Sequence, residues 1–517
     1  MKFKMKKIFL CGIVLLVLSA FYVSAATINA ASCSYNDVLA AITSAQSGDT
    51  VNVPAGSCTW SSDISVQKKV FIEGAGMMST VITANSGAFD LGYSGAHVGN
   101  IGFRSSSDIA IIVKGSGWRI HHCKFESTGG SKIVMIQPQS NTGGSYVLAG
   151  LIDHCEFKDC RIYVRGSLAN WDESEQQHES WTQSAELGKF DTVYIEDCKF
   201  DTKYGGNLFD ADMAGAYVAR FNTMNGGVFE MHSLYQDMRG TRKWEIYHNT
   251  ISNSYSSLYY PFRVRAGTGV VFNNVATGNW DNLAVGLDNV RSYDSTPDRC
   301  DGSSPLDGNE LGKSGYPCRD QIGRGPDNPR WDDNPLVRTF TQPLLPVYAW
   351  GNTEDFEVIA NGISRTHIQA NRDYYNRVAS FTGTSGMGSG PVGNRPSSCT
   401  PNTAYWATDE GGNWNTINSA ANDGKLYKCT ALNVWTEFYT PYTYPHPLAS
   451  GSSPPPPPAA VPGDLNGDSK VDISDLVIVA TNFGRTSGFD VRANVVSSSP
   501  EVIDISDLSF VARRFTG

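Results

Sequence analysis

The sequence predicts a mainly β protein, a parallel β-helix built from stacked coils, followed by a small helical domain with an oxygen-rich loop. Two observations carry this prediction. A short β-strand pattern recurs along the first two thirds of the chain, and a loop-and-helix pattern occurs twice after a run of prolines. The composition agrees, because 517 residues with 51 glycines, 11% aromatic and only 18% charged residues do not suit a disordered, collagenous or long helical chain.

Residues 1–25 predict an export signal. The lysines at its start are Lys2, Lys4, Lys6 and Lys7. An apolar run from Ile8 to Val23 follows them, and small residues end the segment at Ala25 and Ala26. This order is typical of a secretory signal peptide, which is removed from the mature protein. We therefore expect a secreted protein, extracellular or associated with a cell surface, with no membrane insertion.

The formal charge of -10 becomes more negative when the lysine-rich signal is removed, which argues against a nucleic-acid partner. An oxidising compartment favours disulfides. The pairs expected from their proximity in the chain are Cys33 with Cys58, Cys300 with Cys318, and Cys399 with Cys429. No Cys-x-x-Cys zinc spacing occurs in the sequence.

Residues 26–397 are predicted to form the β-helix domain. Its repeat is an alternating strand that ends in Cys or Asn, and the residues at that position are Cys123, Cys155, Cys198, Asn222, Asn249, Asn274 and Asn352. In a parallel β-helix, successive coils stack at about 4.8 Å, so these residues are expected to form an internal ladder of buried thiols and hydrogen-bonded amides. A helical solenoid is disfavoured because the pattern has a period of two and is rich in β-branched and aromatic residues.

The start of the domain supports this architecture. A short helix is expected over Val38–Ile42, then the segment Ser47–Gly56 and a strand over Val70–Gly74. With the ladder, these residues make positions 33–385 resemble the right-handed parallel β-helix proteins of the pectate-lyase-like superfold. The resemblance implies the fold, but that superfold includes lyases, hydrolases and adhesins. The motifs Asn-Thr-Asp, Gly-His-Gly and Arg-Ile-Lys of polygalacturonases do not occur, so a standard polygalacturonase is not expected.

Residues 398–449 are predicted to form an aromatic-rich β cap or small module. Its aromatic residues include Trp406, Trp414, Tyr427, Trp435, Tyr439 and Tyr442. Such rings either seal the last coil or stack on sugars, and sealing is the expectation we favour. Residues 450–462 contain five consecutive prolines and predict an extended linker.

Residues 463–517 begin with an EF-hand-like loop. The expected calcium ligands are Asp464, Asn466, Asp468, Lys470 through its carbonyl, Asp472 and Asp475. The pattern from Asp472 to Phe483 returns from Asp504 to Phe515, which resembles a type I dockerin. That resemblance implies a cohesin-type domain on a scaffold or surface protein as the partner. The residues expected to contact it are Ile473, Ser474, Ile505 and Ser506.

Two departures from this pattern limit the expected calcium content. Ser469 stands where the EF-hand loop has glycine, and the second loop lacks the early ligands of the first. One firm Ca²⁺ site is therefore expected.

The candidate catalytic residues follow phenylalanines on three successive coils. Aligning Phe209, Phe229 and Phe262 places six ionisable side chains in two columns on one outward face. These residues are Asp210, Glu230 and Arg263 in one column, and Asp212, His232 and Arg265 in the other. Tyr163 and Arg165 of the preceding coil are expected nearby.

These residue types suit polysaccharide cleavage, and a glycoside hydrolase is the favoured interpretation. Asp212 or Asp210 with Glu230 would supply the paired carboxyl groups that glycoside hydrolysis uses. A lyase acting on a uronate-containing glycan is the first alternative, with His232 or Arg265 as the base and Arg263 neutralising the uronate. A non-catalytic adhesin is the second alternative, in which the charges form only a surface ion-pair ladder.

Overall fold

The computed structural model describes most of the chain between residues 25 and 515. The described ranges are 25–105, 109–127, 132–137, 148–166, 180–182, 185–204, 206–233, 239–288, 318–326, 342–358, 366–418, 422–450, 462–463, 465, 471–486, 493–496 and 502–515. The predicted signal, Cys300, most of the linker and the predicted ligands Asp464, Asn466, Asp468 and Lys470 lie outside these ranges.

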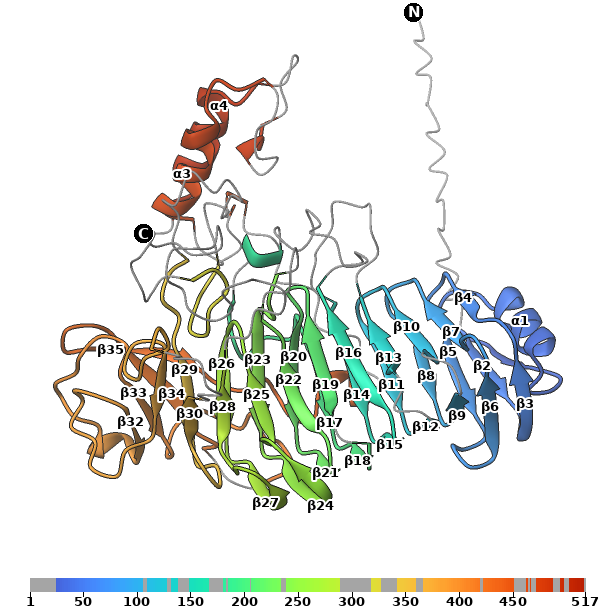
Figure 1. Ribbon diagram of the computed structural model, residues 1–517. Helices are drawn as coiled ribbons and strands as arrows, with labels where there is room; N and C mark the ends of the chain where they lie inside the picture. Colours follow the sequence, from blue (N-terminus) through green and yellow to red (C-terminus); the bar gives the residue numbers. More distant parts are fainter. Residues whose placement is uncertain are drawn as a thin grey trace, which may run out of the picture.

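Three long parallel sheets form the body of the molecule (Figure 1). Sheet A contains β1 (Thr27–Asn29), β2 (Thr50–Val53), β5 (Phe71–Gly74), β8 (His97–Gly99), β11 (Trp118–His121), β14 (Gly150–Asp153), β17 (Val193–Glu196), β20 (Ala216–Arg220), β23 (Lys243–Tyr247), β26 (Thr268–Phe272), β29 (Val347–Trp350) and β31 (Tyr374–Asn376). Sheet B contains β3 (Gly56–Trp60), β6 (Thr80–Ala84), β9 (Gly102–Ser105), β12 (Lys124–Ser127), β15 (Glu156–Lys158), β18 (Lys199–Asp201), β21 (Thr223–Asn225), β24 (Thr250–Leu258) and β27 (Val275–Trp280). Sheet C contains β4 (Ile64–Val66), β7 (Phe89–Leu91), β10 (Ile111–Val113), β13 (Lys132–Ile136), β16 (Arg161–Arg165), β19 (Asn207–Asp212), β22 (Val228–Met231), β25 (Phe262–Val264), β28 (Val285–Leu287) and β30 (Phe356–Val358).

The chain visits the sheets in the order A, B, C from β2 to β28, so each coil adds one strand to each sheet. This topology confirms the predicted parallel β-helix. The first coil is covered by α1 (Tyr35–Ser44), whose N-cap Ser34 accepts a hydrogen bond from the Asp37 amide and whose Val38, Ala41 and Ile42 face the core. An apolar stripe of that kind is what anchors a helix to a sheet end.

The ladder runs through the turn from sheet A to sheet B. Each Asn Oδ1 accepts the backbone N–H of the Asn or Cys one coil before it: Asn249 accepts from Asn222 at 3.0 Å, and Asn274 accepts from Asn249 at 3.1 Å. The Cys155 thiol takes the same position under the Cys123 amide at 3.4 Å. Each member thus satisfies a backbone group that would otherwise be buried without a partner, and the predicted ladder is confirmed.

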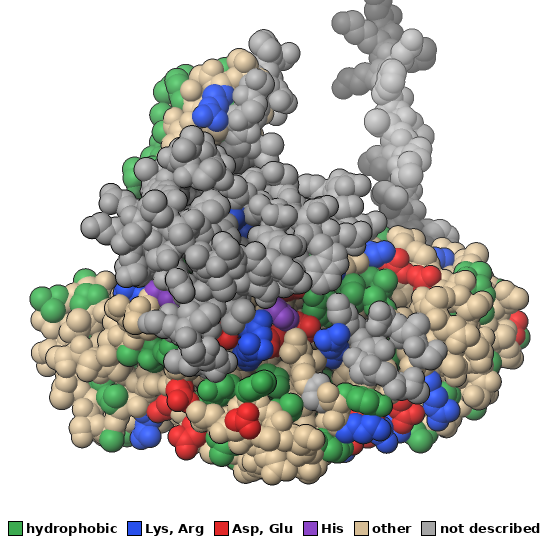
Figure 2. All heavy atoms as spheres, viewed as in Figure 1, with side chains coloured by type: hydrophobic (Ala, Val, Ile, Leu, Met, Phe, Trp, Pro, Cys, Tyr) green, Lys and Arg blue, Asp and Glu red, His purple; other side chains and the backbone are tan. Residues whose placement is uncertain are grey.

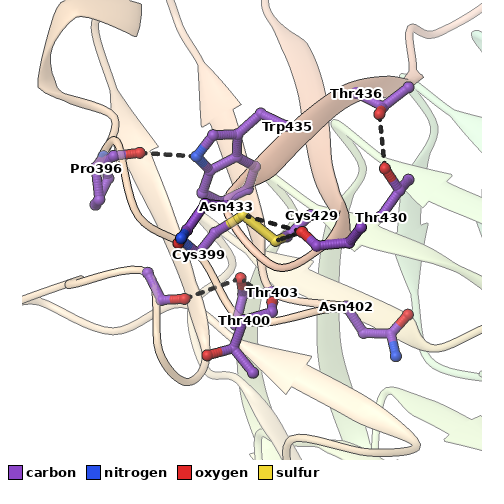
Figure 3. Close-up of a disulfide and its surroundings, with 12 residues drawn as sticks. Pro396, Cys399, Thr400, Asn402, Thr403, Cys429, Thr430, Asn433, Trp435 and Thr436 are labelled. Carbon is purple, nitrogen blue, oxygen red and sulfur yellow. Dashed lines mark hydrogen bonds between the residues drawn. A yellow bond between two sulfur atoms is a disulfide. The ribbon is translucent and has the colours of Figure 1, made fainter.

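A four-stranded sheet follows the last coil. It contains β32 (Met387–Gly390), β33 (Ala404–Ala407), β34 (Lys425–Ala431) and β35 (Val434–Tyr439), with short 3-10 turns at Val392–Asn394 and Pro447–Ser450. The predicted disulfide between Cys399 and Cys429 is present beside Trp435, whose indole N–H donates to the Pro396 carbonyl at 2.7 Å (Figure 3). The predicted disulfide between Cys33 and Cys58 is present as well.

The aromatic residues of this sheet and of the segment after it pack on the outer face of sheet A. Trp406, Trp414, Tyr439 and Tyr444 form one buried cluster with sheet A side chains, including Trp350. Trp350 and Trp406 lie 4.9 Å apart between ring centroids. The rings of these four residues are buried in this contact, so they do not form a surface on which a sugar could stack.

An ion pair lies beneath this contact. Arg220 of β20 is fully buried and pairs with the buried Glu196 at 2.7 Å. Its guanidinium also donates to the carbonyls of Tyr442 and Thr443 at 2.6 and 2.8 Å. The Glu196 carboxylate accepts the His446 amide at 2.8 Å, so both charges bind the segment that crosses sheet A.

The described part of the C-terminal region contains two helices, α3 (Ile473–Asn482) and α4 (Ile505–Ala512). Val471, Ile478, Val479, Ala493, Ile503 and Val511 form their shared core. None of the helices in the described ranges is long and apolar enough to cross a membrane.

Candidate active site

The predicted catalytic residues come together on the outer face of sheet C. The strand register pairs Phe209 with Phe229 and Phe229 with Phe262, as the alignment of phenylalanines requires. Inward phenylalanines fix the register because a shift of one residue would turn every ring out of the core. Asp210, Glu230 and Arg263 therefore form one column across adjacent coils. Figure 2 shows acidic, basic and histidine side chains gathered on this side of the middle coils.

Asp212 is held by two side chains of the preceding coil. Arg165 lies opposite Asp212 in the register and pairs with its Oδ1 at 3.4 Å. The Tyr163 hydroxyl donates to Asp212 Oδ2 and accepts a hydrogen bond from Arg165 at 3.1 Å. The guanidinium of Arg165 also lies over the Tyr163 ring, 4.4 Å from its centroid. Tyr163 and Arg165 thus belong to the site, as the sequence indicated.

Asp210 is held by different cations. His232 Nδ1 lies 2.8 Å from Asp210 Oδ1, and Arg161 lies 3.5 Å from Oδ2. The Asn207 side-chain amide donates to Oδ2 at 3.4 Å. Asp210 and Asp212 are each only 4% exposed, so neither carboxyl is screened by bulk water.

The two aspartates differ in acidity. Burial raises the pKa of Asp212, and the neighbouring charge of Asp210 raises it further against the effect of Arg165. Burial also acts to raise the pKa of Asp210, but His232 and Arg161 offset it and hold the pKa below its usual value. Two neighbouring carboxyls whose pKa values are shifted in opposite directions are the arrangement that acid–base catalysis uses.

The remaining three predicted residues form a second group. Arg265 Nε lies 2.8 Å from Glu230 Oε1, and Arg263 lies 3.9 Å from Glu230 Oε2. Arg263 also pairs with Asp288 at 3.5 Å. Burial lowers the pKa of Arg265 even though the charge of Glu230 acts to raise it. Glu230 is therefore engaged by two cations, while Asp210 and Asp212 carry the differing acidities.

Arg161, Asn207 and Asp288 were missed by the sequence analysis. Arg161 lies two positions before Tyr163 on the same strand face, which is a signal that the sequence contained. Asp288 lies three residues after Val285, just as Arg265 lies three residues after Phe262. Val285 and Phe262 are paired in the register of sheet C. Because the alignment used phenylalanines only, a valine at that core position hid Asp288.

The pair of His232 and Asp210 predicts a pH-dependent stability. Burial lowers the pKa of His232, but Asp210 offsets this and the net shift is upward from 6.5. The stabilisation is therefore complete below about pH 6.5 and is lost as the pH rises through the higher folded value. The lowered pKa of Asp210 adds stability that is lost only as the pH falls below 3.8.

We expect His232→Gln to lose more unfolding free energy at about pH 6 than at about pH 9, relative to wild type, in urea titrations. His97→Gln is the matched control. Burial and Arg119 lower the pKa of His97 to about 4, so His97→Gln should lose less unfolding free energy at about pH 6 than at about pH 9. Equal losses at both pH values for His232→Gln would contradict the prediction.

Comparison with known proteins gives matches among solved structures only. No protein-family profile matches the sequence, and no curated protein matches it. Among solved structures, the matches include a pectin methylesterase in complex with a hexasaccharide, at 12% identity over 50% of this chain and 80% of that one, with a TM-score of 0.24. A mannuronic acid specific polysaccharide family 6 lyase from human gut microbiota matches at 11% identity over 68% of this chain and 86% of that one, with a TM-score of 0.28. The catalytic domain of a GH87 alpha-1,3-glucanase matches at 10% identity over 68% of both chains, with a TM-score of 0.27.

Proposed function

We propose that this chain is a polysaccharide-degrading glycoside hydrolase whose active site is the outer face of sheet C. The observation that carries the proposal is the pair Asp210 and Asp212, two buried carboxyls on one strand whose pKa values are shifted in opposite directions. Alternate residues of a strand lie about 6.6 Å apart on one face. That is close to the separation at which an acid and a base act on opposite sides of a glycosidic bond.

In this proposal Asp212 gives its proton to the leaving glycosidic oxygen. Asp210, kept ionised by His232 and Arg161, takes a proton from the water that attacks the anomeric carbon. Tyr163 donates to one oxygen of Asp212, so the proton is directed to the other oxygen. The bond from the anomeric carbon to the leaving oxygen breaks and the bond to the water oxygen forms, which requires no redox partner.

A lyase is the second candidate, and two observations favour it. The side chains of Arg161 and Arg263 are 31% and 30% exposed, and their ion pairs with Asp210, Glu230 and Asp288 are 3.5–3.9 Å long, so they can turn to a uronate carboxylate. The lowered pKa of Arg265 suits a base. His232 suits that role less, because its contact with Asp210 raises its pKa and so favours the protonated form.

We further propose that the protein is secreted and tethered through its dockerin-like tail. The signal-like sequence of residues 1–25 supports secretion. Exposed apolar side chains support a docking role for the tail, since Ile473 is 65% exposed and Ile505 is 62% exposed. Ser506 is exposed beside Ile505, and Ser474 follows Ile473 in the chain. A cohesin-type domain remains the proposed partner.

Calcium in the first tail loop is likewise a proposal. Asp475 is fully buried, and its two oxygens accept the amides of Leu465 and Asp472 at 2.6 and 2.8 Å. This places its carboxylate against the predicted loop, where it and Asp472 fit a hard oxygen-binding cation such as Ca²⁺. The bound ion would fix the loop against the start of α3.

A panel of neutral and acidic polysaccharides tests the function. New reducing ends without absorbance near 235 nm support the hydrolase. Reducing ends with that absorbance mean that the bond is broken by elimination, and the lyase then replaces the hydrolase. A panel on which nothing is cut, with the protein folded, favours the non-catalytic adhesin.

A further inference from the structure

A small pocket lies at the corner where the chain passes from sheet B to sheet C. Its volume is about 150 Å³, and its lining includes Lys203, Tyr204, Asn253, Tyr255, Ser256 and Leu258. We call it the corner pocket. It is formed by the turn between β18 and β19 and by β24, and β19 is the strand that carries Asp210 and Asp212.

One aromatic ring of the corner pocket faces solvent and the other is fixed. Tyr204 is 50% exposed, with the Lys203 ammonium 5.0 Å from its ring centroid, whereas most other large aromatic side chains of the solenoid are buried. The Tyr255 hydroxyl donates to Asp201 Oδ1 at 2.7 Å, and that oxygen also accepts the Asn225 side-chain amide at 3.0 Å. A preordered ring beside an exposed ring suits a sugar, whose C–H face packs on aromatic carbon.

The coil between these two rings turns the corner with two consecutive glycines. Gly226 and Gly227 occupy the turn before β22 with φ of 76° and 78°, a conformation that favours glycine. A Cβ at Gly226 would meet the Thr202 carbonyl oxygen at 2.1 Å, so no other residue fits there. The same Cβ would lie 3.0 Å from Cδ2 of Tyr255, so glycine at this position lets the Tyr255 ring pack closely against the turn and fixes that wall of the corner pocket.

One wall of the corner pocket is a local extension of the solenoid. β24 has nine residues, more than any other described strand of sheets A, B and C, and it projects with β27 at the lower edge of the molecule in Figure 1. The Asn253 side-chain amide fixes this extension by donating to the carbonyls of Ser256 and Asn279 at 3.0 and 2.6 Å. The Asn253 side chain is only 1% exposed and serves to fix this wall, whereas Ser256 is exposed and holds its hydroxyl where a sugar hydroxyl can bind it.

We propose that the corner pocket binds a sugar ring of the same glycan that is cut on sheet C. Tyr204 precedes Asp210 by six residues, so the two lie within about 22 Å of each other, which a chain of a few sugars can span. Binding at a distance from the cleaved bond contributes to transition-state stabilisation. The inference rests on the proposed function for its substrate, and it adds a position that sheet C alone does not contain.

Two readouts on the glycan panel test this inference: retention of the protein in glycan-containing native gels, and kcat/KM for cleavage. We expect Tyr204→Ala to lower both by roughly tenfold on long glycans, the effect of one lost aromatic contact, and to leave short oligosaccharides little changed. Tyr204→Trp is expected to keep both. Tyr93→Ala is the matched control, because Tyr93 is 49% exposed on an early coil and should bind no glycan.

The outcomes separate the two proposals. If Tyr204→Ala cleaves the glycan with unchanged retention and unchanged kcat/KM, the corner-pocket proposal is wrong and the hydrolase proposal is unaffected. Retention that depends on Tyr204 without any cleavage supports the corner pocket and overturns the hydrolase. Absence of retention for every glycan, or an equal loss in Tyr93→Ala, overturns the corner pocket.

Discussion

Asp212→Asn is expected to lower kcat by about 10²–10⁴-fold, the contribution of a positioned general acid. Asparagine has the same shape and still accepts a hydrogen bond from Tyr163, so the fold of sheet C should be retained. It has no acidic proton to give to the leaving oxygen. The measurement is the rate of reducing-end formation on the glycan that the wild type cuts, with circular dichroism as the check on folding.

Asp90→Asn is the matched control for this substitution. Asp90 lies on the outer face of sheet C, in register with Ile112, and pairs with Lys114 at 2.6 Å. It carries the same charge on the same face but lies coils away from the candidate site, so its loss should leave kcat unchanged. If Asp212→Asn keeps kcat within tenfold of the wild type, Asp212 is not the acid.

Arg220→Met is expected to lower the free energy of unfolding by about 3–5 kcal/mol. The substitution leaves the Glu196 carboxyl fully buried without its cation, with the His446 amide still bound to it. It also removes the two hydrogen bonds to the carbonyls of Tyr442 and Thr443, which lie in the segment that crosses sheet A. Urea unfolding followed by tryptophan fluorescence measures the loss, because Trp406 and Trp414 lie in that contact.

Two further variants decide whether the buried charge causes this loss. Arg220→Met combined with Glu196→Gln should recover part of the stability, because no uncompensated charge then remains. Arg104→Met removes an arginine whose side chain is 57% exposed and which pairs with Glu126, so it should cost under about 1 kcal/mol. Equal losses for Arg220→Met and Arg104→Met would contradict the interpretation.

The fold was largely predictable because its determinants repeat along the sequence. Cys123, Cys155 and Asn249 occur at the same point of each strand pattern, and that point is where one coil must satisfy the backbone of the next. Phe209, Phe229 and Phe262 fixed the register of the site for the same reason. Features that recur coil after coil leave a signal that a single sequence contains.

The features that the sequence did not predict depend on contacts between distant parts of the chain. The pair of Arg220 with the Tyr442 carbonyl spans 222 residues, and no repeat or spacing marks which surface an aromatic-rich segment will cover. The acidities of Asp210 and Asp212 were equally hidden, because they depend on Arg161, Arg165 and His232 at defined distances. Residue type predicted the cluster, but only the geometry assigns different roles to two identical side chains.

Each coil adds one strand to each sheet, and this topology affects how such a protein can change during evolution. Within the three sheets, each strand of an inner coil pairs with the strand one coil before and the strand one coil after it, so a whole coil can be gained or lost with both new neighbours still offering a matching ladder position. Ladder partners separated by 24 residues at one step and by 43 at another show that insertions between strands leave the interior intact. Selection can therefore lengthen or reshape the outer surface without redesigning the core, and a cluster such as Asp210 and Asp212 can arise on coils that were already stable.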